Sequence, residues 1–111
     1  MKFVIPESAK SWVEVANDSD FPIQNLPFTQ AVGDDGFTIL SRIGDLAVDC
    51  VALADEGLLE EPGDLYQDLG ILVAERGPEG LRDLRKQLYG LLESSNGALR
   101  DNAAARETAL R

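Results

Sequence analysis

The sequence predicts an α+β fold in a single domain that covers residues 1–111. Residues 28–49 are rich in strand-forming residues and contain two glycine turns, whereas residues 51–111 carry leucines and alanines at helical spacing. A chain of this length buries enough surface for one modest core. Because the strand-like part precedes the helical part, the two classes of element are segregated along the chain, as in an α+β domain.

Three strands joined by two tight turns are predicted first. The strands cover residues 28–32, 37–43 and 46–49, where apolar and polar residues partly alternate. Gly33-Asp34-Asp35-Gly36 joins the first two strands, because its glycines tolerate positive φ and its aspartates bond their own backbone. Gly44-Asp45 joins the second and third strands, and Gly44 is expected to adopt a positive φ. These segments predict two consecutive β-hairpins.

Two short helices are predicted next. Residues 51–59 form the first, which ends near Gly57, and Glu60-Glu61-Pro62-Gly63 interrupts the chain. Asp64 is predicted to cap a second helix over residues 65–75, because an aspartate side chain accepts hydrogen bonds from the free amides of a first helical turn.

A longer amphipathic helix is predicted to begin at Pro78, since proline is favoured in the first turn. Residues 94–97 end this helix, and the alanine-rich residues 98–111 form a final one. The basic residues Arg82, Arg85 and Lys86 are expected on the solvated face of the long helix. The opposite face is one apolar stripe of leucines: Leu81, Leu84, Leu88, Leu91 and Leu92.

The net charge of −10 is distributed unevenly. Residues 1–75 carry 15 acidic and 3 basic side chains, whereas residues 76–111 carry 5 acidic and 7 basic ones. An acidic surface repels phosphate backbones, so we expect no nucleic-acid partner. We expect no membrane association, because no apolar run approaches 18 residues. The single Cys50 excludes an internal disulfide and is typical of a reducing, cytoplasmic location.

The residue types for catalysis are sparse. The sequence contains no histidine, the commonest general base and metal ligand near neutral pH. Adjacent acids such as Asp34-Asp35, Asp55-Glu56 and Glu60-Glu61 lack the spacing of a calcium loop and are interpreted as turn and surface residues. Without a histidine to activate it, Cys50 is expected to be a buried apolar side chain. We therefore expect no catalytic, metal-binding or cofactor-binding residue in this chain.

Residues 18–28, here called the proline arm, form a stiff apolar segment before the first strand. Pro22 and Pro27 fix their own φ and favour extended backbone at the preceding Phe21 and Leu26. The apolar side chains are expected to dock on the domain, because prolines reduce the entropy lost on docking.

The proline arm closely resembles the opening of the fumarylacetoacetases, and Ile43-Gly44-Asp45 and Leu99-Arg100-Asp101 are similar to two later stretches of the same family. Ser11-Trp12-Val13 and Ala16-Asn17 resemble the entry of its bacterial members. The residues that carry the family signature, expected to be structural, are Asp18, Asp20, Phe21, Pro22, Asn25, Leu26, Pro27, Phe28, Gly44 and Asp45.

The resemblance implies a small SH3-like barrel with helical additions, which is the N-terminal domain of an enzyme that hydrolyses 4-fumarylacetoacetate to fumarate and acetoacetate in tyrosine and phenylalanine breakdown. In that family a separate C-terminal domain holds a divalent metal, magnesium or calcium, and a His–Glu pair that activates water. The resemblance thus implies that this chain is inactive alone, that it packs on that catalytic domain, and that the parent enzyme is a homodimer. We expect Trp12 and residues 98–111 to lie on the face that the catalytic domain covers.

Two alternatives remain open from the sequence. The chain can be a stand-alone interaction module that kept this domain without the enzyme. It can also be a small enzyme that uses carboxylates and a metal, although the missing histidine and ligand spacing disfavour this reading.

Overall fold

The computed structural model describes residues 5, 9–15, 19, 21–33, 36–61, 63–94 and 96–110. The chain forms three strands followed by helices, which confirms the α+β class. The elements are β1 (Phe28–Gly33), β2 (Gly36–Ile43), β3 (Leu46–Asp49), α1 (Cys50–Asp55), the 3₁₀ turn η1 (Gly63–Tyr66), α2 (Leu69–Arg76), α3 (Pro78–Leu92) and α4 (Ala103–Ala109).

The three strands form one antiparallel sheet in the order β1-β2-β3. The pairs Gly33↔Gly36 and Ile43↔Leu46 close its two hairpins, so each predicted turn has two residues between paired strands. Gly44 has a φ of 57°, which confirms the predicted left-handed conformation. Asp34 and Asp35 lie outside the described residues.

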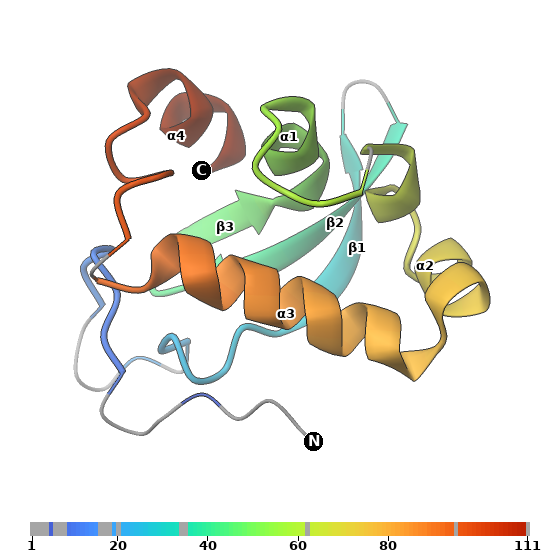
Figure 1. Cartoon of the computed structure of the whole chain (residues 1–111), viewed down its shortest axis with the longest axis horizontal. Helices are drawn as coiled ribbons and strands as arrows, with labels where there is room; N and C mark the ends of the chain where they lie inside the picture. Colours follow the sequence, from blue (N-terminus) through green and yellow to red (C-terminus); the bar gives the residue numbers. More distant parts are fainter. Residues whose placement is uncertain are drawn as a thin grey trace.

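The SH3-like barrel is not confirmed. Among the described residues the sheet is open, with β1 and β3 at its two edges (Figure 1). Closing a barrel requires a continuous ladder between the edges, usually through additional strands. Here the outer side of β3 forms one isolated bridge, between Val48 and Leu110, and α3 crosses one face of the sheet (Figure 1).

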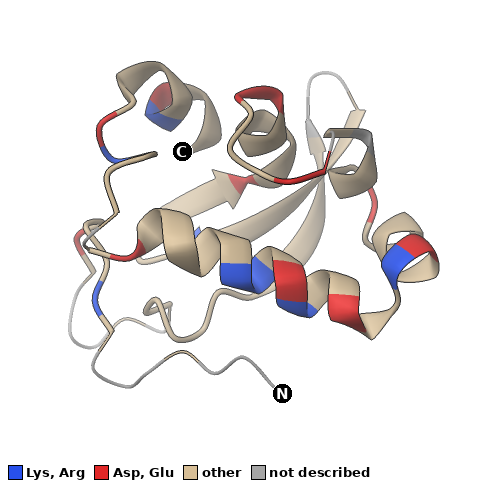
Figure 2. Ribbon diagram, in the orientation of Figure 1, with Lys and Arg blue, Asp and Glu red and all other residues tan. Residues whose placement is uncertain are grey.

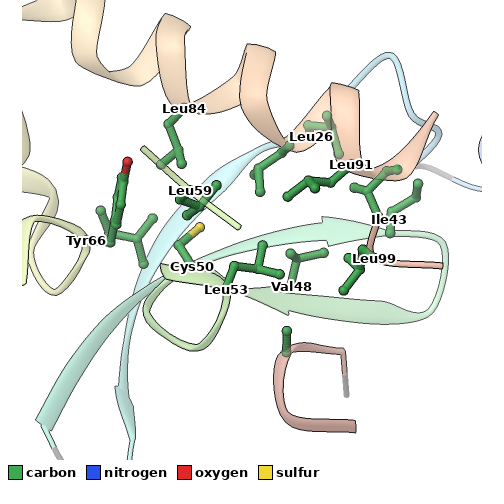
Figure 3. Close-up of a cluster of buried hydrophobic side chains, with 14 of the residues drawn as sticks. Leu26, Ile43, Val48, Cys50, Leu53, Leu59, Tyr66, Leu84, Leu91 and Leu99 are labelled. Atoms are coloured by element: carbon green, nitrogen blue, oxygen red, sulfur yellow. The ribbon is translucent and has the colours of Figure 1, made fainter. Parts of the chain in front are cut away.

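The long helix α3 forms the core with the sheet and α1. Pro78 lies in its first turn, as predicted, and the last turns bury the side chains of Leu84, Leu88 and Leu92. Figure 3 shows Leu84 and Leu91 of this helix facing residues of the sheet and of α1, among them Cys50. The apolar stripe predicted from leucine spacing is therefore the main contribution of the helical half to the core.

The shorter helices depart from the prediction at their ends. Asp68, and not Asp64, caps α2: its carboxylate accepts hydrogen bonds from the amides of Gly70 at 2.7 Å and Ile71 at 3.1 Å. The chain before it forms η1, whose tighter turns take up part of the predicted helix. α4 begins only after Asn102, whose side chain caps it.

Charged residues are spread along the helices and are not gathered at one place (Figure 2). No helix in the described part of the chain is both long and apolar enough to cross a lipid bilayer.

Candidate functional site

The proline arm and the turn between β2 and β3 meet in the structure. The amide of Gly44 donates a hydrogen bond to the carbonyl oxygen of Phe21 at 2.7 Å. A Cβ atom on Gly44 would lie 3.2 Å from the carbonyl oxygen of Glu14 and 3.4 Å from Cγ2 of Val15. Glycine is thus required here twice, by the positive φ and by the close approach of the N-terminal chain. Two separate parts of the family signature form one structural unit.

Two arginines hold the arm on the domain. The Arg42 guanidinium lies 4.3 Å from the ring centre of Phe21, and its Nε donates to the carbonyl oxygen of Gly44. The Arg85 guanidinium lies 5.3 Å from the ring centre of Phe28, and its Nε donates to the carbonyl oxygen of Leu26 at 3.3 Å. Each arginine combines a cation–π contact with a backbone hydrogen bond. The prediction that Arg85 belongs to a solvated helix face was incomplete, because helical spacing does not reveal a partner 59 residues away.

The extended conformation predicted for Leu26 is wrong. Its φ is 37°, in the left-handed region that disfavours residues with a Cβ atom. The chain first turns at Pro22, whose carbonyl accepts the amide of Asn25 at 2.9 Å. Leu26 then reverses direction and buries its side chain completely. Since proline disfavours the right-handed helical region at the residue before it, Leu26 reaches this compact geometry through positive φ.

The other signature residues differ in their exposure to solvent. Pro27 is half-buried, and Asn25 and Asp45 are exposed. Asp18 and Asp20 lie outside the described residues. Of the described signature residues, Phe21, Leu26, Phe28 and Gly44 make the contacts that hold the arm on the domain.

A groove lies beside α4, at the outer side of β3, with a volume of about 490 Å³. Trp12 and Glu14 line one wall, Ala103 and Arg106 of α4 line another, and Leu46 and Leu110 complete it. The Trp12 Nε1 group donates to the carbonyl oxygen of Leu91 at 2.8 Å, which anchors the indole on α3. The sequence predicts Trp12 and residues 98–111 as separate candidates for a contact face. The structure places Trp12 and four residues of that segment around one groove: Ala103, Arg106, Glu107 and Leu110.

A second hollow, of about 310 Å³, lies between η1, α2 and α3. Its floor contains Tyr66, whose pKa is raised mainly by burial. The carboxylates at its rim already have partners: Glu61 pairs with Arg76, and Asp83 accepts from Gln87. Glu79, which also lines the hollow, pairs with Arg82, so each acidic side chain of this lining has a side-chain partner.

The described residues contain no group of three His, Cys, Asp or Glu side chains arranged to hold a metal ion. Cys50 is fully buried, and burial, together with the nearby Asp49 carboxylate, raises the pKa of its thiol far above the ordinary range. The Asp49 carboxylate instead caps α1 by accepting the amide of Ala52 and also accepts the hydroxyl of Thr38.

The sequence is similar to that of known enzymes over most of its length. It is 36% identical over 104 residues to the fumarylacetoacetase of Dictyostelium discoideum. This alignment covers 88% of this chain and 24% of the Dictyostelium protein. The fumarylacetoacetase of Arabidopsis thaliana is 31% identical over 87% of this chain, and that of Caenorhabditis elegans is 34% identical over 91% of it. No protein-family model matches the chain. The chain thus spans about a quarter of the length of the curated relatives that it matches and is related in sequence to part of the fumarylacetoacetases.

Proposed function

We propose that this chain is the N-terminal, non-catalytic part of a bacterial-type fumarylacetoacetase and that it packs on and supports the catalytic part of that enzyme. The sequence similarity to fumarylacetoacetases over 87–91% of the chain carries this proposal. The N-terminal placement rests on the resemblance of the proline arm to the family opening. The contact between Phe21 and Gly44 supports it, because it gives two separated signature segments one structural role.

The chemistry of the proposed parent enzyme would come from outside this chain. The sequence has no histidine, so it cannot supply a His–Glu pair for water activation. A magnesium or calcium ion would be held by carboxylates of the catalytic part. The parent enzyme is proposed to be a cytoplasmic homodimer, and this chain would contribute an apolar contact face and no reacting group.

A chimeric enzyme tests the proposal. Residues 1–111 would replace the matching quarter of the Dictyostelium fumarylacetoacetase, and hydrolysis of fumarylacetoacetate would be followed by its absorbance. We expect the chimera to hydrolyse the substrate, whereas the relative without that quarter and residues 1–111 alone remain inactive. The chimera should lose soluble, active protein on Gly44→Val, which breaks the contact between arm and turn, more than on Gly57→Val, which meets no neighbouring atom.

Two results would contradict the proposal. Hydrolysis by the purified chain alone, in proportion to its concentration and retained after a second purification, would show an independent catalytic site. A folded chimera with no activity would instead favour the alternative of a stand-alone interaction module. In either case the chain would not act as the supporting part of this enzyme.

A further inference from the structure

One row of paired residues crosses the whole sheet. Phe28 of β1 pairs with Ser41 of β2, and Ser41 pairs with Val48 of β3. The row then continues beyond the named strands, because Val48 forms an antiparallel bridge with Leu110. Leu110 thus occupies the place of a residue in a fourth strand, next to β3.

The direction of this bridge leads into the groove beside α4. In an antiparallel ladder, each step forward from Leu110 moves one step back along β3, from Val48 to Ala47 and then to Leu46. Leu46 and Leu110 both line the groove, with Trp12 on the wall opposite α4. The groove therefore follows the path that a strand would take after Leu110.

We propose that the edge of β3 receives a fourth strand in this groove, and that its occupant is an extended segment that directly follows Leu110 in the longer enzyme. This inference rests on the proposed function, which makes the chain part of a longer protein. An edge strand presents unpaired backbone groups that attract another strand, and here the first residue of that strand is already in register. The structure thus indicates both the place of the segment and its direction.

The register also defines the side chains of the segment. Side chains of paired residues lie on the same face of a sheet, and successive residues alternate between faces. The second residue after Leu110 would pair with Leu46 and share its face, which lines the groove. That position requires an apolar side chain, whereas its neighbours point the other way.

Short extensions of the full chain test this register. We would append Val-Thr-Val-Thr after Arg111, which places the first valine opposite Leu46, and compare it with Thr-Val-Thr-Val, which has the same composition in the opposite phase. A Gly-Ser-Gly-Ser extension serves as the unpaired reference. Because Ile43↔Leu46 closes a two-residue hairpin, the amides of Leu46 and Val48 are directed to β2 and the amide of Ala47 is directed to the open edge. Hydrogen exchange of the Ala47 amide and the fluorescence of Trp12, the sole tryptophan, would be measured.

We expect the valine-first extension to slow exchange of the Ala47 amide about tenfold relative to the Gly-Ser extension and to shift the Trp12 emission. The phase-shifted extension should give a smaller effect. Ala103→Phe, which fills the groove, should remove the gain, whereas Ala104→Phe on the same exposed helix turn should keep it, because Ala104 does not line the groove.

Equal exchange in the three extended chains would overturn the inference. So would protection that appears only with rising protein concentration, because the occupant would then be a second copy. None of these readouts uses hydrolase activity. A chimera that fails while the valine-first extension is protected would therefore reject the proposed function alone, and the reverse result would reject only the fourth strand.

Discussion

The proline arm and the C-terminal segment, residues 102–110, lie at opposite ends of the sequence and are attached to the sheet in different ways. The arm is held by the Phe21–Gly44 hydrogen bond, by two arginines over aromatic rings and by the fully buried Leu26. The C-terminal segment buries only the small side chains of Ala105 and Ala109 in α4 and contacts β3 by one bridge.

This difference separates structural residues from a contact surface. Residues of β2, of the following turn and of α3 contact the arm. The arm is therefore an integral part of the packed domain. The C-terminal segment contributes little apolar bulk and leaves a groove beside it. The part of the chain with the most specific family resemblance is therefore internal structure, and the weakly marked part is the better candidate for the proposed contact with a catalytic part.

The largest expected effect compares one leucine from each segment. Leu26→Ala should lower the free energy of unfolding by about 2–5 kcal/mol, because it leaves a cavity at a fully buried site. Leu110→Ala, at a half-buried site, should lower it by about 1 kcal/mol. Urea denaturation of both variants measures the difference. Equal losses would mean that the two segments are anchored equally well.

The glycine of the second turn gives the next effect. Gly44→Val and Gly57→Val both place a β-branched residue at positive φ, with φ values of 57° and 75°. That strain should cost about 1–2 kcal/mol in each variant. Only Gly44 also faces the backbone of Glu14, so Gly44→Val should be less stable than Gly57→Val by at least about 1 kcal/mol. Thermal unfolding compares the two, and similar midpoints would contradict a tightly docked arm.

A smaller effect is expected from the arginine that holds the arm on α3. Arg85→Lys keeps the charge but loses the planar group over Phe28 and the Nε bond to Leu26, at a cost of about 0.5–1.5 kcal/mol. Limited proteolysis should then cut within residues 21–28 faster than in the parent chain. Arg82→Lys is the matched control, because Arg82 forms an exposed pair with Glu79 and its replacement should change little. Identical cleavage rates of the two variants would show that Arg85 does not anchor the arm.

Much of the framework was predictable because its signals are local. Gly44 permits the positive φ of its turn, Pro78 fixes its own φ at the helix start, and the leucines of α3 repeat at the helical period. The stripe could therefore be assigned to the core before any contact was known.

The rest depended on contacts between distant residues. The expectation that Asp64 caps the second helix is wrong, because α2 begins at Leu69 and Asp68 caps it. The positive φ of Leu26 follows from the burial of its side chain and from the preceding turn. The rule for a residue before proline does not include either of these effects. The groove likewise exists only because the bridge from Leu110 brings α4 beside Trp12.

The smallest expected effect lies between the two segments, at Ser41. This residue pairs with Phe28 at the end of the arm and with Val48, the bridge partner of Leu110. Its hydroxyl is buried and has no hydrogen-bond partner among the described residues. Because an unpaired buried hydroxyl is unfavourable, Ser41→Ala should change the free energy of unfolding by less than about 0.5 kcal/mol or stabilise the fold slightly.

Thr38 provides the matched comparison on the same strand. Its buried hydroxyl donates to the Asp49 carboxylate at 2.7 Å, so Thr38→Val should cost about 1–3 kcal/mol by removing one hydrogen bond from that buried carboxylate. Chemical denaturation of both variants gives the two values. A loss above about 1 kcal/mol for Ser41→Ala would show that the hydroxyl has a partner in solution, because only a bonded hydroxyl is costly to remove. Ser41, at the centre of the row from Phe28 to Leu110, would then be a polar link between the arm and the C-terminal segment. The contrast between a firmly anchored arm and a loosely held α4 would be smaller.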